Sequence, residues 1–204
     1  VLEIIHVDLS TIHEDKKNYK KAITILNNLI TNYEKWEDPL NKYYQENYEF
    51  YYTFSELYSW IAMDYIDLDD GLSAVYNYEK SLEYDSNNLG SLINLGWIYD
   101  GGEGGITQNY QKTLEYYEHA AELGHPLALN NLALMYEEGK GVEIDYDKAK
   151  EFYEKSYSLK TSALSYYNLA YFYTYGYGSK IQNKNPTRAT EIITEFLNIY
   201  KESG

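Results

Sequence analysis

The chain has 204 residues and no cysteine, and its 32 acidic residues against 17 basic ones give a formal net charge of −15 and a pI near 4.6. This charge argues against a nucleic-acid partner, because a phosphate backbone is bound by clustered Lys and Arg, and against docking on an anionic membrane surface. The lack of cysteine excludes disulfides, thiolate zinc sites and cysteine nucleophiles within the chain.

Signals of location are few. No apolar run approaches the ~18 residues that a membrane span needs, and no basic-then-apolar leader is visible. The one Asn-x-Thr triplet, at Asn185, has Pro in its centre and is therefore not a glycosylation acceptor. We expect no membrane span, and the sequence gives only a slight preference for a cytoplasmic location.

The N-terminal part of the chain predicts helices. Residues 1–14 alternate enough for a strand, but the context favours a frayed helix or an incomplete repeat. Two later segments, around Ala22 and Ala74, place a small residue one turn before larger apolar or aromatic ones, as amphipathic helices do. These alanines are 52 residues apart, more than one hairpin needs, which predicts an insertion near 34–42. The helix that pairs with the Ala74 helix is expected near 43–65.

Farther along, the chain repeats itself. The motif Asn-Leu-(Gly/Ala)-x-x-Tyr begins at Asn94, Asn131 and Asn168, at a constant step of 37 residues. A second motif, with Lys, a small residue and an aromatic pair, begins at Tyr110 and again at Tyr146. Both motifs have helical spacing, and the glycines after the first helix are typical helix ends. The unit is therefore predicted to be a helical hairpin of about 36 residues that buries its apolar face against its neighbours.

These motifs resemble the Sel1-like repeat, a relative of the tetratricopeptide repeat. The first copy departs from the family pattern at Thr113, and the third has Ile192 and Ile193 in place of the aromatic pair, as a terminal repeat can. The second copy matches best, at Gly139, Gly141, Val142, Asp145, Lys148, Ala149 and Tyr153.

The resemblance implies an all-α fold, a right-handed superhelix (solenoid) of helical hairpins. Tetratricopeptide-like hairpins are expected over residues 1–87. Residues 88–204 are expected to hold three Sel1-like repeats, at about 88–124, 125–160 and 161–202. The hairpins are expected to form one continuous solenoid.

Two segments could be taken for ligand sites. The glycine run 101–105 lacks the spacing of a nucleotide-binding loop and follows a helix rather than a strand, so we interpret it as an interhelical loop. The acidic stretch 64–71 has Ile66 and Leu68 where a calcium loop needs acidic ligands. We interpret this stretch as a solvated turn that caps the next helix.

Catalytic chemistry is not indicated. His119 and Glu122 lie one turn apart with His125 nearby, a metal-like spacing, but His119 is expected to point outward and His125 begins a helix. No local nucleophile elbow is present, although a catalytic triad can be assembled from distant residues. We expect no metal ligands, no cofactor and no catalytic residues, and therefore not an enzyme.

The remaining candidate is a surface. The resemblance implies that the first helix of each hairpin lines a concave face and presents its outward positions to a protein or peptide. By register, the expected partner-binding residues are Ile93, Asn94, Trp97, Asn130, Asn131, Leu134, Tyr167, Asn168 and Tyr171.

Two interpretations of the asparagines at 94, 131 and 168 stay open. Their amides could hold an extended peptide backbone, or they could only tie neighbouring helices together. Trp97 and the tyrosines are candidate anchors, because aromatic side chains supply contact area at low entropy cost. Most of the 27 tyrosines, however, recur at expected core positions.

Three functions compete at this stage. The leading hypothesis is a non-catalytic interaction module or adaptor that binds a protein or peptide on its concave face. The alternative is an immunity or inhibitor protein that neutralises a basic toxin or enzyme, which the net charge of −15 favours. The third, a hydrolase, follows only from the link between some cysteine-rich Sel1-like proteins and β-lactam binding, and it hardly transfers to a chain without cysteine.

Overall fold

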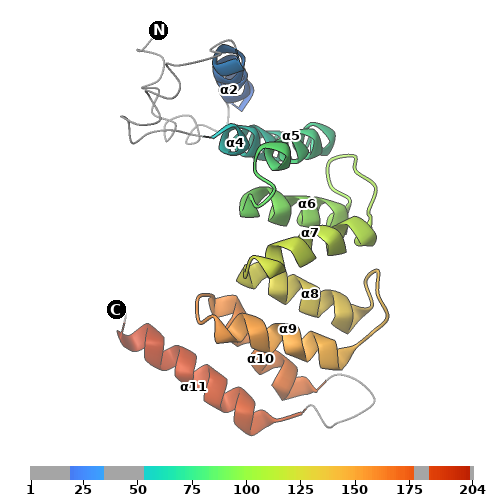
Figure 1. The fold of residues 1–204 in the computed structure, drawn as a ribbon. Helices are drawn as coiled ribbons and strands as arrows, with labels where there is room; N and C mark the ends of the chain where they lie inside the picture. Colours follow the sequence, from blue (N-terminus) through green and yellow to red (C-terminus); the bar gives the residue numbers. More distant parts are fainter. Residues whose placement is uncertain (1–18, 35–52, 177–183, 203–204) are drawn as a thin grey trace. The chain divides into compact units, whose positions relative to one another are not determined.

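The computed structural model describes residues 19–34, 53–176 and 184–202, and these residues form α-helices joined by turns and loops, without a strand (Figure 1). The chain divides into two compact units, residues 1–108 and 109–204. The first unit contains α2 (Tyr19–Glu34), α4 (Phe54–Asp67), α5 (Gly71–Tyr84) and α6 (Leu89–Gly101). The second contains α7 (Tyr110–Glu122), α8 (Pro126–Glu138), α9 (Tyr146–Ser158), α10 (Ala163–Tyr175) and α11 (Pro186–Glu202). The prediction of an all-α fold is confirmed.

Some predictions fall outside the described residues. These are the segment 1–14, the insertion near 34–42 beyond its first residue Glu34, and the start of the helix expected near 43–65. The described portion of that helix is α4. The predicted division at 87/88 and the continuity of the solenoid stay predictions.

Local sequence explains where the helices of the second unit begin and end. The side-chain oxygens of Asn109, Asp145 and Asn185 each accept a hydrogen bond from the backbone N–H three residues on, at 3.2, 3.0 and 3.0 Å. Such side-chain caps satisfy donors that the first turn leaves unpaired, and they start α7, α9 and α11. The helices α8 and α10 end at Gly139 and Gly176, whose φ angles of 72° and 63° favour glycine.

The core of the second unit combines small residues with aromatic rings. Ala133, Ala149 and Ala170 are buried, at 0%, 0% and 3% exposure, which lets the backbones of neighbouring helices approach closely. The ring of Tyr153 on α9 packs against Phe172 on α10 with their centroids 5.7 Å apart. The small and aromatic residues of the repeated motifs therefore form the contact surfaces of the hairpins, as the predicted burial of their apolar face requires.

Tyrosine serves this core because its ring can be buried while its hydroxyl reaches a neighbouring helix. The hydroxyl of Tyr153 donates to Glu137 on α8 at 3.0 Å, and that of Tyr173 on α10 donates to Glu154 on α9 at 2.6 Å. Burial, together with the Glu154 carboxylate, raises the pKa of Tyr173 well above its ordinary value. Part of the high tyrosine and glutamate content is thus explained by hydrogen bonds between helices.

A buried chain of hydrogen bonds joins α8, α9 and α10. The Asn130 amide donates to Ser165 Oγ at 3.2 Å, Ser165 and Ser156 share a bond of 2.6 Å, and Ser156 Oγ donates to the Pro126 carbonyl at 2.9 Å. Because the Ser156 hydroxyl has one proton and gives it to Pro126, Ser165 is the donor to Ser156. The side chains of Asn130, Ser156 and Ser165 are all 0% exposed.

The first unit contains a similar junction. Ser55 on α4 and Ser91 on α6 each bond to Ser81 on α5, at 3.0 and 2.7 Å, and the Asn88 amide donates to Ser55 at 2.9 Å. Small hydroxyl side chains allow three helices to meet closely while their polar atoms stay paired. The buried apolar residues Ile23, Leu26 and Ile30 of α2 pack against α4 in the same unit.

Candidate partner-binding surface

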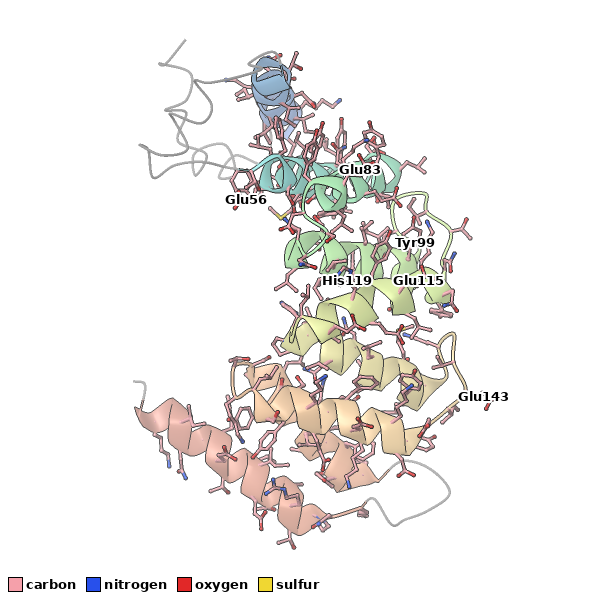
Figure 2. All side chains as sticks on the ribbon, in the orientation of Figure 1. Glu56, Glu83, Tyr99, Glu115, His119 and Glu143 are labelled. Atoms are coloured by element: carbon pink, nitrogen blue, oxygen red, sulfur yellow. The ribbon has the colours of Figure 1, made fainter. Side chains whose placement is uncertain are left out.

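Charge separates the two helices of each hairpin in the second unit. The first helix α8 carries only Glu137 and Glu138, at its C-terminal end, and α10 carries no charged residue. Figure 2 shows acidic side chains elsewhere, with Glu115 on α7 and Glu143 on the loop after α8. The acidic residues of the second helices α7 and α9 are exposed, namely Glu115, Glu118, Glu122, Asp147, Glu151 and Glu154.

An exposed row of aromatic rings runs along α10. Tyr167, Tyr171 and Tyr175 follow each other at intervals of four residues and are 63%, 41% and 60% exposed. Their ring centroids are 5.9 Å apart between Tyr167 and Tyr171 and 4.5 Å apart between Tyr171 and Tyr175. We call these three residues the tyrosine ridge. Because each ring already rests on the next, a partner orders little additional side-chain motion on binding.

The ridge includes two predicted residues and extends beyond them. Tyr167 and Tyr171 were expected from the register of the repeat, whereas Tyr175 and Leu164, which is 41% exposed, were missed. The signal was present in the sequence, since Tyr175 continues the four-residue spacing and the whole segment 163–175 lacks charge. The expected residues were obtained by aligning α10 with the first copy of the repeat, and the aligned positions end before Tyr175. The prediction therefore missed the last turn of the helix.

The helix α8 lies next to α10 and contributes less than expected. Leu134 is exposed, at 36%, as predicted. The expectation that Asn130 points outward is wrong, because its side chain is 0% exposed and its amide is bonded to Ser165. One residue turns the side chain by about 100° around the helix, and this places Asn130 on the side of α8 that the next hairpin covers.

The predicted asparagines differ in their hydrogen bonds. Asn131 and Asn168 are partly buried, and neither side chain forms a hydrogen bond within the part of the chain that the structure describes. The amide of Asn94 donates to the Gly90 carbonyl of its own helix at 2.9 Å. Beside it on α6, Ile93 is partly buried. Because Asn94 belongs to the first unit, a ladder of all three amides stays a prediction.

Trp97 is the most prominent predicted residue of the first unit. Its side chain is 46% exposed on α6, and Met63 on α4 is 44% exposed. Both lie on first helices of their hairpins. Large apolar side chains are therefore exposed on first helices in both units.

The carboxylate at the end of α8 is engaged within the fold. Glu137 accepts the hydrogen bond from Tyr153, and burial raises the pKa of Glu137 above its ordinary value, with that hydrogen bond acting in the opposite direction. The group thus belongs to the contact between α8 and α9 rather than to the charge offered to a partner.

The two segments that imitate ligand sites have structural roles. The glycine run forms the loop after α6, as predicted, and it packs on the start of α5, where Gly71 N–H donates to the Gly104 carbonyl at 2.9 Å. A Cβ on Gly104 would lie 2.3 Å from the nitrogen of Gly71, so this contact requires glycine. Asp70 caps α5, as predicted, by accepting from the N–H of Ser73 at 3.0 Å. The prediction that the acidic stretch 64–71 is a solvated turn is wrong at Asp64, whose side chain is only 1% exposed.

Neither a metal cluster nor a membrane-spanning helix is found in the described part of the chain. No group of three or more His, Asp or Glu side chains there could hold a metal ion, and none of the helices described is long and apolar enough to cross a bilayer. Burial lowers the pKa of His125 at the start of α8. One shallow hollow runs along the surface of α11, and another lies between α2 and α4. Neither hollow is lined by the predicted partner-binding residues.

Comparison with known proteins decides the family. A model of the Sel1 repeat matches residues 90–125, 126–160 and 163–191. The chain is a Sel1-repeat protein. The prediction of three Sel1-like repeats is confirmed, and Sel1 repeats are generally protein–protein interaction modules.

Two solved structures resemble this Sel1-repeat chain. One is a protective antigen present in uropathogenic Escherichia coli strains that displays an SLR fold, with a TM-score of 0.59 and 24% identity over 68% of this chain and 29% of that one. The other is a Sel1 repeat protein from Oxalobacter formigenes, with a TM-score of 0.60 and 24% identity over 69% of this chain and 55% of that one. At this identity the likeness shows the fold alone, and it supports the helical-repeat solenoid as the fold class. Comparison with curated proteins gives no match.

Proposed function

We propose that this Sel1-repeat protein is a non-catalytic adaptor that holds a protein or peptide against the exposed face of α8 and α10. The observation that carries the proposal is the tyrosine ridge on a helix without charged residues. Sel1-repeat proteins are typically non-catalytic scaffolds, and the same is proposed for this chain.

The chemistry of this face supports a peptide or protein partner. Tyrosine is among the residues that most often dominate binding energy, because its ring excludes water and its hydroxyl can still form a hydrogen bond. The half-buried amides of Asn131 on α8 and Asn168 on α10 offer donors and acceptors suited to a peptide backbone. The lack of charge on α10 favours a partner that contacts it with apolar or aromatic side chains.

The ridge can be tested by selection and substitution. Peptides selected from a random library on the full chain are measured by fluorescence anisotropy against the wild type and Tyr171→Ala. A residue at the centre of a binding surface contributes about 2 kcal/mol or more, so a loss of affinity of roughly 30-fold is expected.

The matched control is Tyr76→Ala on α5. Tyr76 is 59% exposed and lies outside the proposed face. Its substitution therefore removes the same aromatic ring from a side chain that is also exposed. We expect its affinity to stay within about twofold of the wild type. Circular dichroism checks that both variants are folded. Selected peptides that bind Tyr171→Ala as tightly as the wild type would remove the ridge from the proposal.

A second candidate is an inhibitor or immunity protein for a basic toxin or enzyme. The exposed acidic residues of α7 and α9 favour it, because they lie on other helices than the tyrosine ridge. Binding through such a surface weakens steeply as salt rises, mainly through the on-rate. Binding through the ridge changes little with salt, so one salt titration of any captured partner separates the two functions.

A further inference from the structure

The tyrosine ridge is the redox-active surface of the second unit that is most open to solvent. Among the described residues of this unit, the exposed tyrosines are the three members of the ridge. The chain has no cysteine, its three tryptophans lie in the first unit, and Met135 in the second unit is only 2% exposed. An oxidant that approaches the described part of this unit from solution therefore meets the phenol rings of the ridge.

Two rings of the ridge already touch. The centroids of Tyr171 and Tyr175 are 4.5 Å apart and their planes are inclined by 43°, a distance at the short end of the range of about 4.5–7 Å for aromatic pairs. The side chains are 41% and 60% exposed. Tyr175 is the last residue of α10, before Gly176 with its φ of 63°, and helix ends fray. The ring of Tyr175 can therefore turn its edge toward Tyr171 at little cost.

Other tyrosine pairs lack this combination of proximity and exposure. Tyr157 and Tyr166 have ring centroids 5.1 Å apart, but their side chains are only 8% and 4% exposed. In the first unit, the rings of Tyr58 and Tyr84 are 5.7 Å apart, and Tyr84 is 51% exposed. The last two residues of the ridge are both closer together than these pairs and open to solvent.

We propose that the ridge is an oxidation site, at which a peroxidase acting with hydrogen peroxide couples Tyr171 and Tyr175 into a dityrosine cross-link. The oxidant removes one electron and the hydroxyl proton from each ring. The two phenoxyl radicals then form a carbon–carbon bond between the ring carbons next to their oxygens, and the hydrogen on each of these carbons moves to the oxygen and restores the phenol. The two electrons and two protons that are released reduce one hydrogen peroxide to two molecules of water.

Tyr167 enlarges the target of the oxidant. Its ring centroid lies 5.9 Å from that of Tyr171, and its side chain is 63% exposed. A radical formed on Tyr167 can take an electron from Tyr171, because the two phenols have the same chemistry and their rings are neighbours. The radical then stands beside Tyr175. Oxidation at either end of the ridge thus leads to the same cross-link.

The cross-link changes the stiffness and the charge of α10. It joins residues one turn apart, and a short closed loop restricts the fraying of the last turn. It also places the two hydroxyls side by side, so a hydrogen bond from one phenol stabilises the phenolate of the other and lowers its pKa below the ordinary value of about 10. Because α10 carries no charged residue, the cross-linked ridge gains a negative charge at a lower pH than the untreated ridge does.

Treatment of the full chain with a peroxidase and a limiting amount of hydrogen peroxide tests the proposal. The protein is kept at low micromolar concentration, and the monomer is isolated by size-exclusion chromatography so that only cross-links within one chain are counted. We expect dityrosine fluorescence in this monomer. We also expect the tryptic peptide 161–180 to be lighter by two hydrogens and to give no backbone fragments between Tyr171 and Tyr175 in tandem mass spectrometry.

Phenylalanine variants separate the radical chemistry from packing, because phenylalanine keeps the ring and lacks the phenol. Tyr175→Phe is expected to lose most of the dityrosine found in the wild-type monomer. The matched control is Tyr76→Phe on α5, because Tyr76 is 59% exposed and Tyr175 is 60% exposed. This control is expected to keep the wild-type yield.

A wild-type monomer without dityrosine, or a Tyr175→Phe monomer with the wild-type yield, overturns the proposed cross-link. The cross-link forms without a partner, and the binding of selected peptides is measured on the untreated chain. Failure of the cross-link and failure of the proposed function are therefore observed in separate experiments.

Discussion

The buried hydrogen-bond chain from Asn130 to Pro126 allows one stability effect to be worked out in detail. Ser165→Ala removes the acceptor of the Asn130 amide and the donor to Ser156, while Ser156 keeps its bond to the Pro126 carbonyl at 2.9 Å. The main cost is therefore the Asn130 amide, which is left unpaired at 0% exposure. A buried donor without a partner costs about 1–3 kcal/mol, and we expect a loss of about 2 kcal/mol in the second unit.

The compensating variant adds Asn130→Leu to Ser165→Ala. Replacing both partners by apolar groups of similar shape is often nearly neutral. The Oδ1 atom of Asn130 already lacks a hydrogen-bond partner among the described residues, so leucine removes that cost as well. The contact between α7 and α8 already has an apolar version of this arrangement, because the buried residues Ala120 and Ala128 occupy the positions that correspond to Ser156 and Ser165. We expect the double variant to return to within about 1 kcal/mol of the wild type.

Hydrogen–deuterium exchange resolves this effect, because it reads each helix separately. A loss of 2 kcal/mol corresponds to roughly 30-fold faster exchange of the protected amides in α8, α9 and α10. All three tryptophans, at 36, 60 and 97, lie in the first unit, so the urea transition followed by their fluorescence is expected to change little. A double variant less stable than Ser165→Ala would show that the unpaired amide is not the source of the loss.

Two further effects follow from the same unit. Gly141→Ala is expected to cost about 2 kcal/mol or more, because Gly141 has a φ of +69° and a Cβ there would lie 2.7 Å from the Cβ of Tyr110. Gly124→Ala, with a φ of +81° and open space around it, is expected to cost about 1 kcal/mol, and thermal denaturation compares the two. The hydrogen bond from Lys160 lowers the pKa of Glu195 below its ordinary 4.5. Its contribution to stability is thus present above that value and lost as the pH falls through the lowered pKa. Glu195→Gln is expected to reduce the loss of stability on acidification, measured as unfolding midpoints below about pH 5; an unchanged pH dependence would contradict this role.

Periodicity in the sequence determined the hairpin architecture. The 37-residue step of Asn94, Asn131 and Asn168 predicts three equivalent helices, because residues that repeat at a fixed interval occupy equivalent environments in a stacked array. The capping and terminating residues act within one turn of their own position, so local sequence also placed most helix ends. The small and aromatic residues of the two motifs, such as Ala133, Ala149 and Tyr153, are buried, in agreement with the predicted apolar face of the hairpin.

The tertiary structure decided what each side of a helix faces. Asn130 and Asn131 are neighbours in sequence, yet one is fully buried and the other partly exposed, because the adjacent hairpin covers only one side of α8. Asp64 is buried although it belongs to an acidic stretch that looks solvated. Ile193 and Leu197 have the register of core residues and are exposed, since none of the described helices covers them. Spacing along a sequence determines which residues share a stripe, but the neighbours that bury or expose that stripe come from distant segments, and only the folded structure shows where they lie.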